Sequence, residues 1–261
     1  MGMFSKKTPL EREWELLLKK EQAFIQKRQE KRESFLNQKL QEKVPEKLQG
    51  TLDAAFFKAF TMIFEKGTGV IEKTYRKEEL EKRYKINEFA DETLQSRKSL
   101  KTFSKQAGAA GNVNLLLSGV SGIGMGVLGV GIPDIPIFTG MILKNIYEIA
   151  LNYGYGYESV EERYFILMLI QGAVSSGEQF LDIEIKINRY IEEECLPSGY
   201  QRVEQIRETA SVLSGELLYM KFVQGIPVIG AVGGAYDVVY MKRITEYAML
   251  KYQRRFLKRK K

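Results

Sequence analysis

The chain has 261 residues, of which 28% are charged and 44% hydrophobic, and its formal net charge is +7. This length and balance are those of a globular protein with one large domain or two small ones. The chain contains no histidine and a single cysteine, Cys195. Imidazole catalysis, histidine-ligated zinc and disulfides within the chain are therefore excluded, and we expect no cofactor.

The N-terminal part of the chain is rich in charge and shows no apolar segment typical of a signal peptide, so we expect a cytoplasmic protein. Apolar residues recur at steps of three and four from about Pro9 to Lys43, which predicts one long charged helix. Pro45 interrupts the pattern, and a second amphipathic helix follows up to Gly67. Residues 70–106 are predicted to be helical, with mobile connections, because their periodicity is weak.

A window of 28 residues, from Gln106 to Pro133, has no charged side chain and is rich in glycine. Within it, Gly124, Gly126 and Gly129 have the G-x-G-x-x-G spacing of dinucleotide-binding loops. Such a loop joins a strand to a helix, but no strand–helix alternation surrounds this one, and prolines follow its third glycine. We therefore interpret these glycines as contacts for close helix packing.

The window begins a predicted helical hairpin, from Val113 to Tyr153. Its turn contains Pro133, Asp134 and Pro136, because prolines disfavour a helical conformation in the preceding residue. Asp134 suits the N-cap of the second helix, and Pro136 suits its first turn.

Two apolar segments carry glycines on one helix face, and we expect these segments to pack against each other. The glycines concerned are Gly122, Gly126, Gly230, Gly233 and Gly234.

The hairpin is open to three interpretations. A spanning helix needs about 20 apolar residues, a length that Val113 to Gly131 barely reaches. Basic residues flank the hairpin on both sides, which is typical of segments that face the cytoplasm; they are Lys98, Lys101, Lys105 and Lys144. The hairpin either enters a bilayer, touches its surface reversibly or forms a soluble core, and we favour surface contact.

The rest of the chain is also predicted to be helical. Ser159 and Glu162 have capping-box spacing at the start of a third apolar helix. Residues 178–194 fit either a strand or a helix, and we predict a helix because no partner strand is present. The predicted fold is an all-α bundle with the glycine-rich hairpin at its core and a long charged N-terminal helix. It divides into a charged region, 1–105, and a glycine-rich core with a basic tail, 106–261, which form one cooperative unit.

The positive excess lies at the C-terminal end, where residues Phe222 to Lys261 hold nine Lys or Arg and two acids. Each basic residue near an anionic leaflet contributes about 1 kcal/mol to binding. We therefore predict that the last basic residues contact anionic lipid of the inner leaflet; they are Arg254, Arg255, Lys258, Arg259, Lys260 and Lys261. No RNA-binding motif is present, so nucleic acid is not the expected partner.

An alternative function is that of an enzyme or carrier for a lipid or another apolar ligand, held between the glycine-faced helices. Its candidate polar groups are Asp134, Arg163 and Asp237, because each acid is alone in a long apolar stretch and Asp237 needs a basic partner. Two isolated acids do not make an active site, so we predict no catalytic residue and no metal site.

Two blocks of the sequence resemble the signature segments of the EcsC family of bacterial proteins. They are "GVGIPDIPIFTGMILKNIYEIALNYGYGYESVEERYFIL" and "IPVIGAVGGAYDVVYMKRITEYAMLKYQRRFL". The resemblance implies a helical protein without assigned catalytic residues, and the founding member of the family is encoded beside an ABC transporter. We therefore expect a non-catalytic accessory or adaptor protein, peripheral to the inner face of the membrane. A membrane protein such as a transporter is a further expected partner, and the sequence indicates no particular oligomeric state.

Overall fold

The protein has an all-α fold, which confirms the predicted fold class. The computed structural model describes residues 7–29, 46–66, 69–126, 134–223 and 235–261, and within these ranges every regular element is a helix. The side chains of residues 46, 66, 70, 112–126, 134, 219–223 and 235–238 are not described. None of the described helices combines the length and the apolar character that crossing a bilayer requires.

The charged first part of the chain forms helices in its described residues. These are α1 (Pro9–Gln29), α3 (Glu46–Lys66), α4 (Gly69–Glu72), α5 (Lys77–Leu94) and α6 (Arg97–Gly126). The predicted N-terminal helix is thus present as far as Gln29, and its expected continuation to Lys43 lies outside the described residues.

The more apolar second part also forms helices. These are α7 (Asp134–Asn152), α8 (Val160–Val174), α9 (Gly177–Glu193), α10 (Arg202–Val223) and α11 (Ala235–Arg259). The ambiguous segment 178–194 is a helix, as predicted. Ser159 caps α8, because its hydroxyl accepts a hydrogen bond of 3.1 Å from the backbone N–H of Glu162.

The first helix of the hairpin was predicted to begin at Val113, and this boundary is wrong because α6 begins at Arg97. The charged stretch before Val113 is helical because Leu100, Phe103 and Ala107 recur on one buried face. The predicted region boundary between residues 105 and 106 falls inside α6, so one continuous helix joins the two regions.

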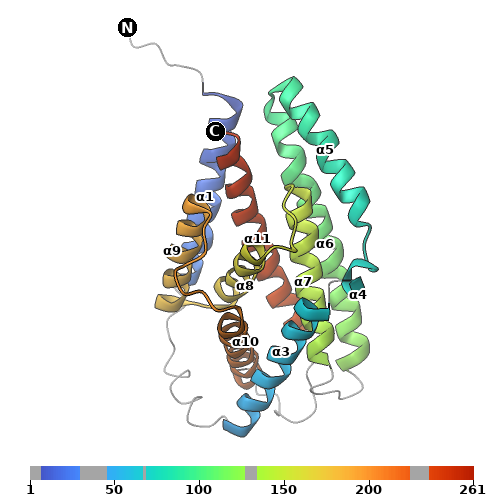
Figure 1. The fold of residues 1–261 in the computed structure, drawn as a ribbon, viewed down its shortest axis with the longest axis vertical. Helices are drawn as coiled ribbons and strands as arrows, with labels where there is room; N and C mark the ends of the chain where they lie inside the picture. Colours follow the sequence, from blue (N-terminus) through green and yellow to red (C-terminus); the bar gives the residue numbers. More distant parts are fainter. Residues whose placement is uncertain (1–6, 30–45, 67–68, 127–133, 224–234) are drawn as a thin grey trace.

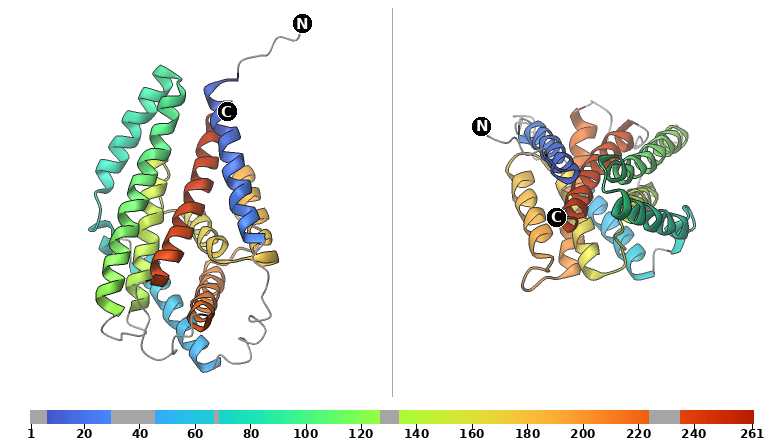
Figure 2. Two further views of the ribbon diagram at one scale, coloured as in Figure 1. Left: turned by 180° about the vertical axis from the view of Figure 1, so that it is seen from behind. Right: turned by 90° about the horizontal axis from the view of Figure 1, so that it is seen from above.

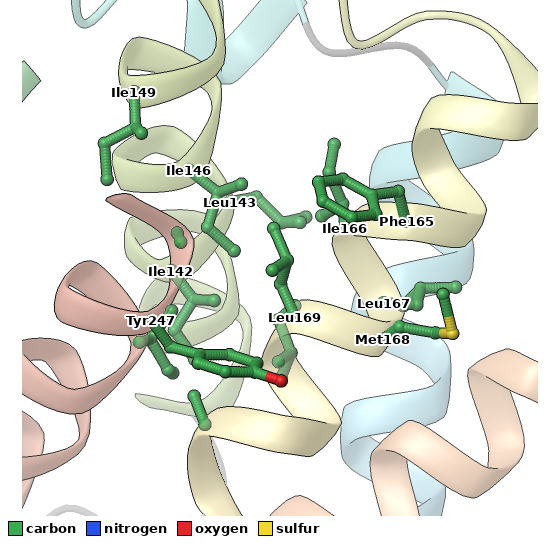
Figure 3. Close-up of a cluster of buried hydrophobic side chains, with 14 of the residues drawn as sticks. Ile142, Leu143, Ile146, Ile149, Phe165, Ile166, Leu167, Met168, Leu169 and Tyr247 are labelled. Atoms are coloured by element: carbon green, nitrogen blue, oxygen red, sulfur yellow. The ribbon is translucent and has the colours of Figure 1, made fainter. Parts of the chain in front are cut away.

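The centre of the molecule is α8, which lies across the long axis between the other helices (Figure 1). Every residue from Tyr164 to Val174 is buried, as expected for a helix with neighbours on all sides. In Figure 3, side chains of α7 such as Ile142 and Ile146 point toward those of α8, and Tyr247 of α11 closes the cluster.

The helices α1 and α11 lie side by side and run in opposite directions, so that the start of α1 and the end of α11 meet at one end of the molecule (Figures 1 and 2). The first part of α6 runs beside both of them. These three helices, which come from distant parts of the sequence, enclose the groove described below.

Glycines allow α6 and α8 to approach α11 closely. A Cβ atom on Gly111 of α6 would lie 2.5 Å from Cγ2 of Thr245, and one on Gly172 of α8 would lie 2.6 Å from Cε1 of Tyr247. Both distances are too short for an alanine, so these glycines are required for the packing. After α7, Gly154 adopts φ +79°, which favours glycine, and the ring of Tyr84 fills the position of its missing side chain.

Candidate functional site: a basic groove beside the C-terminal helix

The six basic residues predicted to contact lipid all have partners within the chain. The expected tail is largely helical, because α11 continues to Arg259. Arg254 donates a hydrogen bond of 2.5 Å to Glu21 of α1. Lys260 lies 3.0 Å from the Asp91 carboxylate of α5, and Lys261 lies 3.5 Å from the centre of the Trp14 ring. These contacts tie the end of α11 to α1 and α5.

Arg255 is buried, and its Nη1 donates hydrogen bonds to both carboxylate oxygens of Glu162 in α8, at 2.9 and 2.8 Å. Its guanidinium lies between aromatic rings, with its carbon 4.0 Å from the ring centre of Tyr155 and 4.5 Å from that of Phe165. Burial alone would lower the pKa of Arg255, but the Glu162 carboxylate outweighs burial and raises this pKa. Arg255 therefore lies in the core and does not face a membrane.

Lys258 and Arg259 bind backbone carbonyls at the ends of two other helices. Lys258 donates to the carbonyls of Ile191 and Glu192 at 2.6 and 2.8 Å, which satisfies the last turn of α9. Arg259 donates to the Tyr84 hydroxyl at 2.6 Å and to the Tyr153 carbonyl, just after α7, at 3.3 Å. Both cations thus stabilise helix ends within the protein.

A buried charge cluster, which the sequence did not reveal, lies next to these contacts. Lys251 is 1% exposed and donates to Glu21 and Asn188 at 3.0 Å each, and it also binds Glu184. Tyr247 donates a hydrogen bond of 2.5 Å to the same Glu184 carboxylate. The only signal for this cluster is that Lys251 and Glu184 each interrupt an apolar helix face.

The structure does not describe the three candidate polar groups as one site. Asp134 is the first residue of α7 and Asp237 lies in α11, but their side chains are outside the described residues. Arg163 of α8 faces α3, where it donates to the Phe64 carbonyl at 3.2 Å and lies over the Phe64 ring.

Most of the glycines and prolines predicted for the turn and for helix packing lie where the structure describes no side chains or no residues. Gly122 and Gly126 lie in the last part of α6, and Pro136 is exposed in the first turn of α7. The other predicted positions, Pro133, Gly230, Gly233 and Gly234, lie outside the described residues.

The groove of interest has a volume of about 1060 Å³ and lies between α1, the first part of α6, and α11. Its apolar lining comes from Leu16, Ala23 and Phe24 of α1 and from Met249 and Leu250 of α11. Its charged lining comprises six basic and two acidic residues, namely Lys20, Lys27, Arg97, Lys98, Lys101, Lys105, Glu13 and Glu246. The groove therefore combines an apolar wall with an excess of positive charge.

Five lysines of this groove are exposed, and in the described part of the chain none of them forms an ion pair; they are Lys20, Lys27, Lys98, Lys101 and Lys105. They differ in this from Lys251, Arg254 and Arg255 of α11. They differ likewise from Arg97, which binds the buried Glu13 of α1. Lys98, Lys101 and Lys105 are those already noted on one flank of the hairpin. These five lysines thus gather charge that an anionic partner can reach along one groove.

A second cavity, of about 910 Å³, lies between α8, α9 and α10. Its charged lining is mixed, with Lys186 and Arg189 facing Glu193, Glu204 and Glu208. Tyr200 and Gln205 at its edge bind each other at 2.8 Å, and Gln205 also holds the Tyr164 carbonyl at 2.9 Å. This balance of charge does not favour an anionic ligand.

Comparison with known proteins concerns the chain as a whole. The protein is 30% identical over 125 residues to "Uncharacterized protein YdbA" of Bacillus subtilis (strain 168), a match that covers 47% of this chain and 45% of that relative. The chain therefore matches about half the length of this relative. No solved structure matches significantly. The profile of the EcsC protein family matches residues 11–257, which is nearly the whole chain, and the protein therefore belongs to the EcsC family.

Proposed function

We propose that the protein is a non-catalytic helical accessory protein that binds peripherally to the anionic inner face of the cell membrane. The observation that carries this proposal is the set of five exposed lysines without an ion-pair partner in the described chain, gathered along one groove. Anionic lipid headgroups attract such a cluster, and each lysine near the membrane surface contributes about 1 kcal/mol to the binding free energy.

The proposal differs from the sequence-based expectation in the residues that make the contact. The expectation assigned it to Arg254, Arg255 and the four basic residues after them, which have partners inside the protein. Using them for lipid would require breaking ion pairs that connect α11 to α1, α5 and α8. The groove lysines require no such rearrangement, and a membrane protein such as a transporter is a further partner that fits this location.

Flotation of the purified chain with lipid vesicles tests the proposal. We expect binding to vesicles that contain phosphatidylglycerol, no binding to pure phosphatidylcholine, and loss of binding at high salt, because exposed charges are screened. Equal binding to both kinds of vesicle, or no binding to either, would refute the proposed electrostatic contact.

A further inference from the structure

The groove is built from one stripe of side chains on each of three helices. On α1 the lining residues are Glu13, Leu16, Lys20, Ala23, Phe24 and Lys27, and on α6 they include Lys98, Lys101, Thr102 and Lys105. On α11 they are Glu246, Met249, Leu250 and Gln253. Steps of three and four place each set on a single helix face. The groove is thus a continuous surface formed by three helices.

The shape of the groove favours an elongated ligand. From Glu13 to Lys27 the α1 stripe spans about 21 Å at the rise of an α-helix. The Arg97–Glu13 ion pair joins the start of α6 to the first part of α1. The start of α1 and the end of α11 meet at this end of the molecule (Figure 1). The groove volume of about 1060 Å³ is slightly above the range of about 300–1,000 Å³ that is typical of ligand pockets.

The chemistry of the lining changes across the groove. Phe24 and Leu250 are buried in its floor and join the core through the stacked rings of Phe24 and Tyr247, whose centres are 5.0 Å apart. Leu16 lies at the edge with 36% exposure. The lysines of α1 and α6 line the same groove with charged tips on long apolar stems. An apolar floor beside ammonium groups fits a molecule with an alkyl chain and an anionic head.

We propose that this groove binds one anionic lipid, with an acyl chain along Leu16, Phe24 and Leu250 and the headgroup phosphate at the lysines of α6. The proposal rests on the proposed membrane association for the source of the lipid. Beyond that association, a single lipid leaves the plane of the bilayer and binds between three helices. Lys98, Lys101 and Lys105 bind the head. The two acids of the groove do not oppose this, because Arg97 neutralises Glu13, and Glu246 lies on α11 and not on the helix that holds the head.

Calorimetric titration of the full chain with dodecyl phosphate, below its micelle concentration, tests the proposal directly. We expect one molecule to bind per chain, and at least roughly tenfold weaker binding of dodecyl maltoside, which lacks the charge, and of inorganic phosphate, which lacks the chain. Equal binding of inorganic phosphate would identify a plain anion site, and equal binding of dodecyl maltoside a non-specific apolar surface. Either result, or no binding of dodecyl phosphate, would overturn the proposal.

A matched pair of variants locates the acyl chain. Leu16 lines the groove, whereas Leu18, with a similar exposure of 40%, lies on the same helix outside it. We expect Leu16→Ser to weaken dodecyl phosphate binding roughly fivefold or more and Leu18→Ser to leave it unchanged, since only the first removes apolar contact with the chain. Equal effects of both substitutions would overturn the assigned location.

The two proposals fail in different ways. If the chain floats with anionic vesicles but does not bind dodecyl phosphate, the groove inference is wrong and the membrane association stands. If it binds dodecyl phosphate but does not float, the association is wrong and the groove holds a lipid delivered in another way.

Discussion

The contacts of single residues explain why few of the positive charges near the C-terminal end of the chain are available to an external partner. Lys251, Arg254 and Arg255 follow one another closely in sequence, yet their carboxylate partners come from α1, α8 and α9. A buried charge is tolerated only when a partner compensates its lost hydration. The basic residues of α11 therefore hold three other helices in place.

Replacement of Lys251 tests this role. Lys251→Met leaves the Glu184 carboxylate buried without its cation, and we expect a loss of about 3–5 kcal/mol in the free energy of unfolding. Chemical denaturation monitored by circular dichroism measures this loss. The control is Arg207→Met, which removes an exposed pair with Glu204 and should cost within about 1 kcal/mol. Equal losses of stability from the two substitutions would show that Lys251 does not specifically hold α11 to the helices that carry its partners.

The same cluster predicts a pH dependence of stability. Burial alone would raise the pKa of Glu184, but Lys251, together with hydrogen bonds from Tyr247 and Asn188, lowers this pKa below its ordinary value of 4.5. The stabilisation is therefore complete above pH 4.5 and is lost as the pH falls through the lower value of the folded state. Unfolding free energies of the wild type and Glu184→Gln should converge as the pH falls below 4.5, and a constant difference would contradict this pKa direction.

The partners of these charges could not be predicted from the sequence. Charge counting correctly located the basic excess in Phe222 to Lys261. It carries no information on pairing, because Glu21 and Glu184 lie far from Lys251 along the chain and meet it only after the helices have packed. A free tail and a buried network therefore have the same sequence pattern.

At the level of helices, local signals were sufficient to identify most elements. Apolar periodicity predicted α7 and α9, and the capping box at Ser159 predicted the start of α8. The start of α6 was missed because the sequence changes from charged to apolar in the middle of that helix. Its buried face continues through this change, from Leu100 to Gly111, since packing against α11 depends on that face and not on mean hydropathy.

Close helix packing at Gly111 can be tested by adding one methyl group. Thr245, which opposes Gly111, accepts a hydrogen bond of 2.5 Å from Asn145 and donates one of 2.6 Å to the Met241 carbonyl, so it has little freedom to move. We expect Gly111→Ala to destabilise the protein by about 1–3 kcal/mol in thermal or chemical unfolding.

The matched control for Gly111 is Gly140, which lies inside α7 with nothing within 4 Å of a Cβ atom at that position. Gly140→Ala should stabilise the protein by about 0.5–1 kcal/mol, because alanine favours the helix. If Gly111→Ala were also stabilising, the close approach of α6 to α11 would be wrong.

At the scale of the whole molecule, the groove is a product of the tertiary fold. The sequence drew attention to Lys98, Lys101 and Lys105 as a basic flank, but it did not indicate that Phe24 and Leu250 form an apolar floor next to them. Residues of α1 and α11 are more than two hundred positions apart in the chain, as the Glu21–Arg254 contact illustrates. The two helices pack antiparallel (Figure 2), and together with the first part of α6 they line a groove that is both apolar and basic.

The central claim is that membrane binding depends on the groove lysines in particular, and flotation of charge-matched variants tests it most directly. One variant is Lys98→Gln/Lys101→Gln/Lys105→Gln, and its control is Lys82→Gln/Arg83→Gln/Lys85→Gln, which removes the same exposed charge from α5 outside the groove. Circular dichroism checks that both variants fold.

At about 1 kcal/mol for each lysine, the groove variant should bind vesicles that contain phosphatidylglycerol roughly 100-fold more weakly than the wild type, and the control should bind nearly as well as the wild type. An equal loss in both variants would mean that overall charge governs binding, and unchanged binding of the groove variant would mean that another surface makes the contact. Either result would contradict a membrane-binding role for the groove.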